Sequence, residues 1–383
     1  MEAIALSREV LEWAAHRAGQ TLESFALLAA KRDRDRAKIR EGVLTPRQLE
    51  RLAKLARVPF GYLFLAEPPT LSVPAIPDLR QTKDAVPLSA DFYEVLEDAL
   101  AKQEWYADYL EEHGGRPLEF VGKYKLTPKL KAEVVVTEII RSFDISDDDR
   151  RFSPDADAYF SRLSSKVEAQ GVLVIKTGFV KSNTKRTLSE AEFRGFALPH
   201  PMAPLVFVNG NDAKVAAVFT LLHELAHIWL GVSGVSGGDL RSTSSSEVFC
   251  NSVASRILVP VEKFNERWEG PDSLERVAKF FRVSKLVIAR RALEQGLVDQ
   301  KFYDEVAAKS QKIKKTGAPT ADITIPVRNG KRFTRAVIAS AMSGETLLRD
   351  AARLLNVRPD TVVSLATKSR KADGDKNGRE VHR

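Results

Sequence analysis

The spacing of apolar residues predicts a mostly helical chain. Apolar positions recur every three or four residues, the period of an amphipathic helix, in several stretches. In the first 66 residues these stretches are about 6–18, 22–30, 33–41 and 46–58. Further helices are predicted at 91–112, 128–142, 154–169 and 214–230, and another from Glu247 to just before Pro260.

Three short stretches have the pattern of β-strands instead. They are "GVLVIK" at 171–176, "RGFALP" at 194–199 and "PLVFVN" at 204–209. The segment that follows the 214–230 helix, "GVSGVSGGDLRSTSSS", is almost entirely glycine, serine and threonine. That composition predicts a loop.

The rest of the chain suggests how the domains are divided. Four prolines in residues 67–78 predict an extended linker or arm. Residues 272–296 and 334–366 both have a helix, turn, helix rhythm, and the polar residues 369–383 predict a disordered basic tail. We therefore expect an α+β, mostly helical fold, divided into a helix-turn-helix-like bundle, a linker, a central domain with a small antiparallel sheet, a helical C-terminal region and the tail. The ranges are 1–66, 67–82, 83–262, 263–368 and 369–383.

Composition narrows the class of protein. A chain of 383 residues, 44% apolar and 29% charged, is typical of two or three folded domains. It contains no apolar stretch long enough to cross a membrane and no signal-peptide pattern at its start. One cysteine, Cys250, cannot form an internal disulfide, so we expect a reducing, cytoplasmic environment.

The net charge of +8 is compatible with nucleic-acid binding. Much of the basic excess lies in residues 31–40 and from Lys309 onward. A solvated face or tail explains such runs equally well.

The strongest chemical signal is "FTLLHELAH". His223 and His227 lie four residues apart, so on a helix their imidazoles project from one face, about 40° apart around the axis. Two nitrogen ligands at this spacing suit one tetrahedral metal ion such as zinc. Glu224 lies close enough to take a proton from an activated water, which is the role of a general base. The alternative is two ordinary histidines in a buried helix. Burying two imidazoles without hydrogen-bond partners costs free energy.

A hydrolytic zinc site needs a third protein ligand and an open position. His113, His200 and His382 are candidates, as is any nearby carboxylate. Glu247 is the best placed, because it begins a helix after a flexible loop; the alternative is an acid placed to favour the helix dipole. Asn251, one turn later, lies on the same face of the helix as Glu247. It is a candidate to support a metal ligand without binding the ion itself. Cys250 points in a different direction, and we expect it to be a small buried residue.

These residues resemble the core of the ImmA/IrrE family of metallo-endopeptidases. The resemblance rests on "FTLLHELAH" followed by "SEVFCNSVASRILVP", on the strand-like segments that precede them, and on "VPFGYLFLAEPP" and "PDLRQT". It implies a zincin-like fold with His223, His227 and Glu247 as ligands of Zn²⁺, or of Mn²⁺ or another divalent ion, and Glu224 as the general base. It also implies that the strand at 204–209 is an edge that pairs with an extended substrate peptide. His200 stands where such proteins often carry an acid.

The family resemblance also implies a regulatory role. Members typically cleave a repressor or antitoxin, often one encoded nearby, and so release a transcriptional or stress response. The competing interpretation is a DNA-binding regulator or antitoxin whose zincin domain is a structural or partner-docking module.

The N-terminal segment resembles an XRE-type (Cro/repressor-like) helix-turn-helix domain. Its turn is unusual, because Ala30 replaces the usual glycine and Lys31 and Arg36 replace apolar residues. Candidate phosphate contacts are Arg32, Arg34, Arg36 and Lys38, although Asp33 and Asp35 between them offset part of the attraction. Helix-turn-helix proteins often dimerise, so DNA and a second copy of the chain are expected partners beside the protein substrate.

Overall fold

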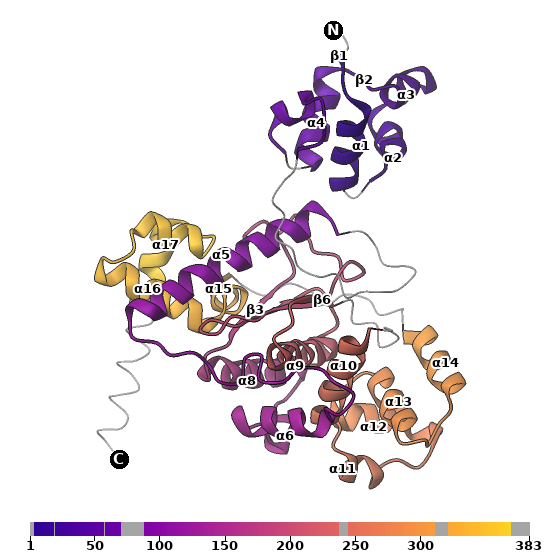
Figure 1. The fold of residues 1–383 in the computed structure, drawn as a ribbon, viewed down its shortest axis with the longest axis vertical. Coiled ribbons are helices and arrows are strands. Elements are labelled where there is room, and N and C mark those ends of the chain that lie inside the picture. The colour runs from indigo at the N-terminus through magenta and orange to yellow at the C-terminus, as the bar shows by residue number, and fades with distance from the viewer. Residues whose placement is uncertain are drawn as a thin grey trace. The chain divides into compact units, whose positions relative to one another are not determined.

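A computed structural model describes residues 4–18, 20–56, 58–69, 88–236, 244–310 and 321–368 (Figure 1). The chain divides into two compact units, one of residues 1–75 and 86–97 and the other of residues 76–85 and 98–383. The predicted linker and tail lie largely or wholly outside the described residues.

The first unit is a small helical bundle closed by a two-stranded ribbon. Strand β1 (Ile4–Ala5) pairs antiparallel with β2 (Val43–Leu44). Around this ribbon lie α1 (Arg8–Arg17), α2 (Leu22–Ala29), α3 (Asp33–Arg40), α4 (Pro46–Ala56) and the 3₁₀ helix η1 (Phe60–Phe64). The predicted apolar stripes of these helices form one core, which includes Leu11, Phe25, Ile39 and Leu52, each 0% exposed. The four helices expected in this region are therefore confirmed.

The second unit contains a four-stranded sheet in the order β3-β5-β4-β6. The strands are β3 (Leu173–Thr177), β5 (Leu205–Asn209), β4 (Gly195–Leu198) and β6 (Gly234–Ser236). The α+β, mostly helical class expected from the sequence is confirmed. The sheet, however, is mixed: β4 pairs antiparallel with both β5 and β6, whereas β3 runs parallel to β5.

Two expectations about this sheet are wrong. The segment around 204–209 cannot be a substrate-binding edge, because β5 is hydrogen-bonded to β3 on one side and to β4 on the other. The segment after Leu230 is not purely a loop, because Gly234–Ser236 form the edge strand β6. Pairing with β4 outweighs the weak strand preference of glycine and serine, which local composition cannot reveal.

Helices pack against this sheet. The predicted helix at 214–230 coincides with α9 (Lys214–Leu230), which packs against β4 and β5 and is flanked by α8 (Ala156–Ala169) and α10 (Ser245–Leu258). Helix α5 (Ala90–Glu112) precedes them, and α6 (Ala132–Ser142) packs against α10. Every residue of α9 from Ala217 to Leu230 is buried, so this helix forms the centre of the core.

The remaining helices follow in the order α7 (Asp147–Arg151), α11 (Val261–Asn265), the 3₁₀ helix η2 (Pro271–Ser273), α12 (Leu274–Phe281), α13 (Lys285–Glu294), α14 (Gln300–Ser310), α15 (Ala321–Asn329), α16 (Lys331–Ser343) and α17 (Leu348–Leu354). A last helix covers 359–368. Residues of α12 and α13 belong to the same core as α9. No helix among the described residues is long and apolar enough to cross a membrane.

A close backbone contact holds the C-terminal end of α9. Gly231 caps the helix in the left-handed conformation, with φ of 64°. A Cβ atom added there would lie 2.8 Å from Cα of Gly122. The adjoining segment donates to the last carbonyls of the helix, from Gly122 N to Ile228 O at 2.9 Å and from Tyr124 N to Trp229 O at 3.1 Å. These bonds satisfy carbonyls that every helix end leaves without an intrahelical partner.

The C-terminal helices are joined to α8 through Glu168. Its Oε1 accepts a hydrogen bond from the backbone N–H of Arg332 at 2.9 Å, and the Arg332 guanidinium donates to Tyr106 Oη at 2.6 Å. Burial raises the pKa of Glu168 to about 7, against the opposing effect of the hydrogen bond from Arg332. The folded protein therefore favours the protonated form of this carboxyl.

We expect Gly231→Ala to destabilise the fold more than Gly114→Ala. Gly114 also has a left-handed backbone, with φ of 71°, but a Cβ there would meet nothing within 4 Å. The control should therefore lose only the backbone preference, about 1 kcal/mol, whereas Gly231→Ala adds a collision and should lose on the order of 3 kcal/mol. Urea unfolding measures both. Equal losses would show that the close approach to Gly122 contributes nothing.

The stability of the protein should depend on the ionisation of Glu168. Because the pKa of Glu168 is raised in the folded state, its contribution is fully present below about pH 4.5 and is lost as pH rises through about 7. In the Glu168→Gln variant this side chain cannot ionise. Between pH 5 and 8 the free energy of unfolding of the variant should therefore fall by about 2–3 kcal/mol less than that of wild type. Urea unfolding across this range tests it, with Glu111→Gln, an exposed glutamate on α5, as the control. Parallel profiles for wild type and Glu168→Gln would contradict the expectation.

Candidate metal centre

Helices α9 and α10 bring three ligand atoms together. His223 and His227 lie one turn apart on α9, and Glu247 lies in the first turn of α10. The two Nε2 atoms of the histidines are 3.1 Å apart. Glu247 Oε1 lies 3.0 Å from His227 Nε2, and its Oε2 lies 3.4 Å from His223 Nε2. These three residues form a group that can hold a metal ion.

The separations fit a small divalent ion. Ligand atoms that bind zinc tetrahedrally at about 2.0–2.1 Å stand roughly 3.3 Å from one another. The donor set of two imidazole nitrogens and one carboxylate is the combination found in hydrolytic zinc sites. Both Glu224 oxygens are buried and have no hydrogen-bond partner among the described residues. An unpartnered buried carboxylate is costly, and a water held by an ion would relieve that cost.

The electrostatics of His223, His227 and Glu247 also suit a bound cation. Burial opposes ionisation of Glu247, but the two neighbouring imidazoles outweigh it and hold the pKa of Glu247 far below its usual range. Burial likewise opposes charge on His223, yet the Glu247 carboxylate raises the pKa of His223 overall. For His227 burial prevails, and its pKa is lowered. The carboxylate thus remains ionised in an apolar core because positive charge stands beside it.

Glu224 differs from Glu247 in its environment. Its side chain is 0% exposed, and burial raises its pKa to about 8. The negative charge of Glu247 acts in the same direction. A carboxyl whose pKa lies close to neutral pH is suited to accepting and releasing a proton.

Two residues of the centre have no signal in the sequence. Ser236, the last residue of β6, places its Oγ 3.2 Å from His223 Nε2. Gly195, the first residue of β4, lies against the general-base candidate: a Cβ there would be 2.9 Å from Glu224 Oε1, 2.6 Å from Thr220 Cγ2 and 2.8 Å from Phe207 O. Neither residue belongs to a recognisable sequence motif. The pairing of β4 and β6 in the sheet brings both residues to α9, and a local sequence pattern does not reveal that pairing.

The other predicted residues lie as follows. Asn251 is buried beside His223 and helps to raise the pKa of that imidazole. His113 is exposed and contacts Tyr109 O, and His200 accepts hydrogen bonds at Nδ1 from Met202 N and Ala203 N, each at 3.2 Å. Neither belongs to the metal-ligand group, and His382 lies outside the described residues. Cys250 is buried and free, and burial raises the pKa of its thiol, which confirms the expected small buried residue.

Comparison with known proteins supports the interpretation of this centre. Residues 167–293 match the Peptidase_M78 family, described as the IrrE N-terminal-like domain. The matched segment contains the whole ligand group, supports the expected ImmA/IrrE family for this region and indicates metallopeptidase chemistry. Residues 329–368 match DUF8813, a domain of unknown function. No curated protein and no solved structure matches the chain.

In the N-terminal unit, the candidate DNA contacts have different surroundings. Arg32, Arg34 and Lys38 are exposed. Arg36, in contrast, donates from Nε to Ala30 O at 3.0 Å and from Nη1 to Asp33 Oδ1 at 2.8 Å. Ala30 has an extended backbone, φ −139° and ψ 139°, so this turn does not need the usual glycine. Arg36 therefore stabilises the turn and is a poor candidate for a phosphate contact.

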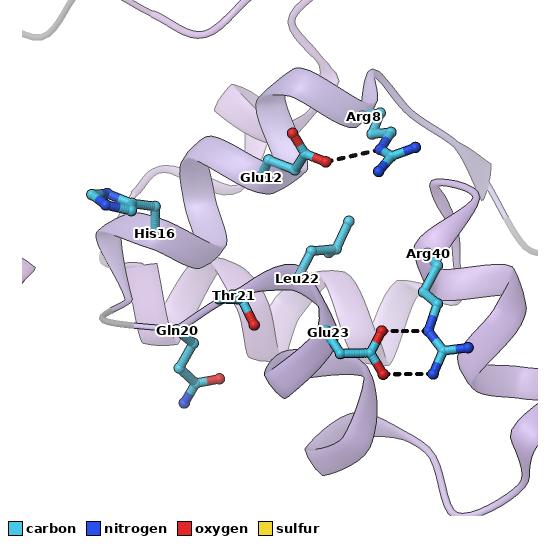
Figure 2. Close-up of a pocket in the computed structure, with 8 residues that line it drawn as sticks. All are labelled: Arg8, Glu12, His16, Gln20, Thr21, Leu22, Glu23 and Arg40. Carbon is cyan, nitrogen blue, oxygen red and sulfur yellow. Dashed lines mark hydrogen bonds and ion pairs between the residues drawn. The ribbon is translucent and has the colours of Figure 1, made fainter.

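The same unit has a hollow of about 420 Å³ between α1, the start of α2 and the end of α3 (Figure 2). Two ion pairs occupy its rim. Arg8 Nε lies 2.8 Å from Glu12 Oε1, and Arg40 makes two hydrogen bonds of 2.5 Å to Glu23. These side chains already pair with one another, so they leave little charge free to recognise a ligand in the hollow.

Gly195→Ala should destabilise the second unit by about 1–3 kcal/mol, since a methyl group cannot fit between β4 and α9 without moving the sheet or Glu224. Thermal or urea unfolding measures the loss. Gly61→Ala is the matched control, because a Cβ at Gly61 meets nothing within 4 Å. A Gly195→Ala protein as stable as wild type would contradict the close approach of β4 to α9.

Proposed function

We propose that this chain is a metal-dependent endopeptidase of the ImmA/IrrE family that cleaves a regulatory protein such as a repressor or antitoxin. The observation that carries the proposal is the convergence of His223, His227 and Glu247 beside Glu224. The match of residues 167–293 to the IrrE N-terminal-like domain supports it.

In this proposal His223, His227 and Glu247 hold the ion. Zinc or a similar divalent ion, when bound, supplies Lewis-acid chemistry: it acidifies water and polarises a carbonyl group. Glu224 takes the proton from the attacking water at its carboxylate and passes it to the leaving amine. Asn251 lies beside the His223 imidazole, and Gly195 allows β4 to lie close to Glu224.

The substrate would bind along β6 rather than β5. Strand β6 forms one edge of the sheet and carries Ser236 beside the metal ligands. An extended peptide that adds to this edge would lie next to the centre. In the present conformation β6 and the four key side chains are buried: His223 and Glu247 are 2% exposed, and Glu224 and His227 are 0%. Cleavage therefore requires an opening of the site.

DNA binding by the N-terminal unit is part of the same proposal. Its exposed Arg32, Arg34 and Lys38 support it, and the XRE-type resemblance is its other basis. A protein that binds DNA through this unit and cleaves a repressor would act on transcription at two points.

Purified protein should contain about one divalent ion per chain, measured by elemental analysis. His227→Ala should lose most of this metal, because a three-ligand site that loses one ligand binds far more weakly. Glu224→Gln should retain the metal yet lose about 100-fold or more in proteolysis, since the general base alone is removed.

Proteolysis is measured without knowing the substrate by labelling new protein N-termini in cells that express either wild type or Glu224→Gln. Glu190→Gln, an exposed glutamate, is the control. Termini present with wild type and the control but absent with Glu224→Gln support the enzyme. A metal-loaded wild type that produces no such termini, with the cellular phenotype unchanged in Glu224→Gln, favours the docking module instead.

A further inference from the structure

The C-terminal residues 331–368 form three helices in a helix-turn-helix arrangement. Helix α16 packs against α17 (Figure 1). A four-residue turn at 355–358 joins α17 to the helix at 359–368. Asn356 in this turn has a left-handed backbone, with φ of 54°. Asparagine is one of the few residues other than glycine that adopt this conformation readily.

Burial separates this unit into an inner and an outer face. The inner face consists of small and apolar residues: Ala351, Leu355 and Val362 are 0% exposed, and Ala352 and Ala366 are at most 5% exposed. The outer face of the last helix consists of Asp360, Val363, Ser364 and Thr367, all exposed. Their spacing of three, four and seven residues places them in one stripe along the helix.

A second segment with the same rhythm provides a comparison. Helices α12 and α13 are joined at Arg282, which also has a left-handed backbone, with φ of 56°. Helix α13, however, is buried over Val287, Ile288, Ala289, Arg291 and Ala292. It therefore has no comparable face to offer a ligand. The two segments share a shape, and of the two only the C-terminal one leaves its second helix accessible.

The exposed stripe and its surroundings suit duplex DNA. Serine can donate to and accept from base edges, and aspartate can accept from cytosine N4. The Thr367 hydroxyl donates to Val363 O at 3.0 Å but can still accept a hydrogen bond, and threonine and valine can contact the thymine methyl group. Arg349 and Arg353, on α17, and Arg358, in the turn that precedes the last helix, are also exposed. Among the described residues neither Arg353 nor Arg358 forms an ion pair, so both guanidinium groups are available to phosphates. We propose that residues 331–368 are a second helix-turn-helix that binds duplex DNA.

The turn is fastened to the unit that contains the metal centre. Asn329 Nδ2 donates to Leu355 O at 3.0 Å, and Asn356 Nδ2 donates to Asp98 Oδ1 at 2.8 Å. These bonds involve the turn and leave the stripe exposed. DNA held by this module would therefore lie at a defined position relative to the peptidase centre. DNA binding here requires no catalysis by that centre.

The test is the binding of a fluorescein-labelled duplex of mixed sequence, about 30 base pairs long, to the full-length protein, measured by fluorescence anisotropy across a salt series. The double variant Arg353→Glu/Arg358→Glu should bind at least about tenfold more weakly at low salt. The slope of log affinity against log salt should fall by about 2, because each of the two arginines neutralises one phosphate in the wild-type complex.

Two double variants with the same charge change serve as controls. Lys129→Glu/Arg141→Glu changes exposed cations elsewhere in the same unit, and Arg34→Glu/Lys38→Glu changes the N-terminal unit. Unfolding midpoints confirm that each variant is folded. Weakened binding by the C-terminal pair and near wild-type binding by the Lys129/Arg141 pair support the module, whatever the N-terminal pair does. Wild type that fails to bind even at low salt, or equal binding by wild type and the C-terminal variant, overturns it. Equal weakening by the Lys129/Arg141 pair also overturns it, because this result shows attraction by net charge alone.

Val363→Asp gives a second measurement. Val363 is 44% exposed, so the change places a negative charge on the stripe without disturbing the core. We expect DNA affinity to fall by about tenfold or more, because the carboxylate would face the negatively charged duplex. Unchanged affinity in this variant would show that the helix at 359–368 does not face the DNA.

Discussion

Two imidazoles and a carboxylate converge inside an apolar core, and this convergence constrains the structure around the candidate metal centre. Helix α9 is buried over all of its residues from Ala217 onward, so His223, Glu224 and His227 have almost no access to water in this conformation. Polar groups in such a place need partners, because burying them unpaired costs free energy. Glu247 supplies one partner from α10, and a divalent ion between the three side chains would satisfy the remaining lone pairs.

The rest of the second unit positions these groups. Strand β4 approaches α9 closely enough that only glycine fits at position 195, and β6 brings Ser236 to His223. The last carbonyls of α9 receive hydrogen bonds from the segment around Gly122. A site held from several directions keeps its ligands within the narrow geometry that metal binding requires. The same packing closes the site, so the proposed peptidase function requires a conformational change that admits a peptide.

The helix pairs α2–α3, α12–α13 and α17 with the helix at 359–368 differ in their surroundings. In the N-terminal unit Arg36 is used to hold the turn, which leaves Arg32, Arg34 and Lys38 exposed. In the middle arrangement α13 is part of the core. At the C-terminal end the stripe from Asp360 to Thr367 is exposed. A similar pair of helices is thus buried in the core in one part of the chain and exposed to solvent in another.

The sequence by itself determined the helices with clear apolar periodicity and the pair of histidines on α9. A spacing of four residues places two side chains on one face of any helix, whatever surrounds it. Glu247 was the best-placed third ligand because it begins a helix after a flexible loop, although His113 and His200 remained open until the structure placed them elsewhere.

Only the tertiary structure decided the interior position of β5, the edge strand β6, the positions of Ser236 and Gly195 beside His223 and Glu224, and the burial of α13. Each of these depends on contacts between segments far apart in the chain, such as β4 with β6 or α9 with β4. Local periodicity and composition contain no information about such contacts. Gly234–Ser236 look like loop residues until β4 pairs with them, and the two later helix-turn-helix segments look alike until burial distinguishes them.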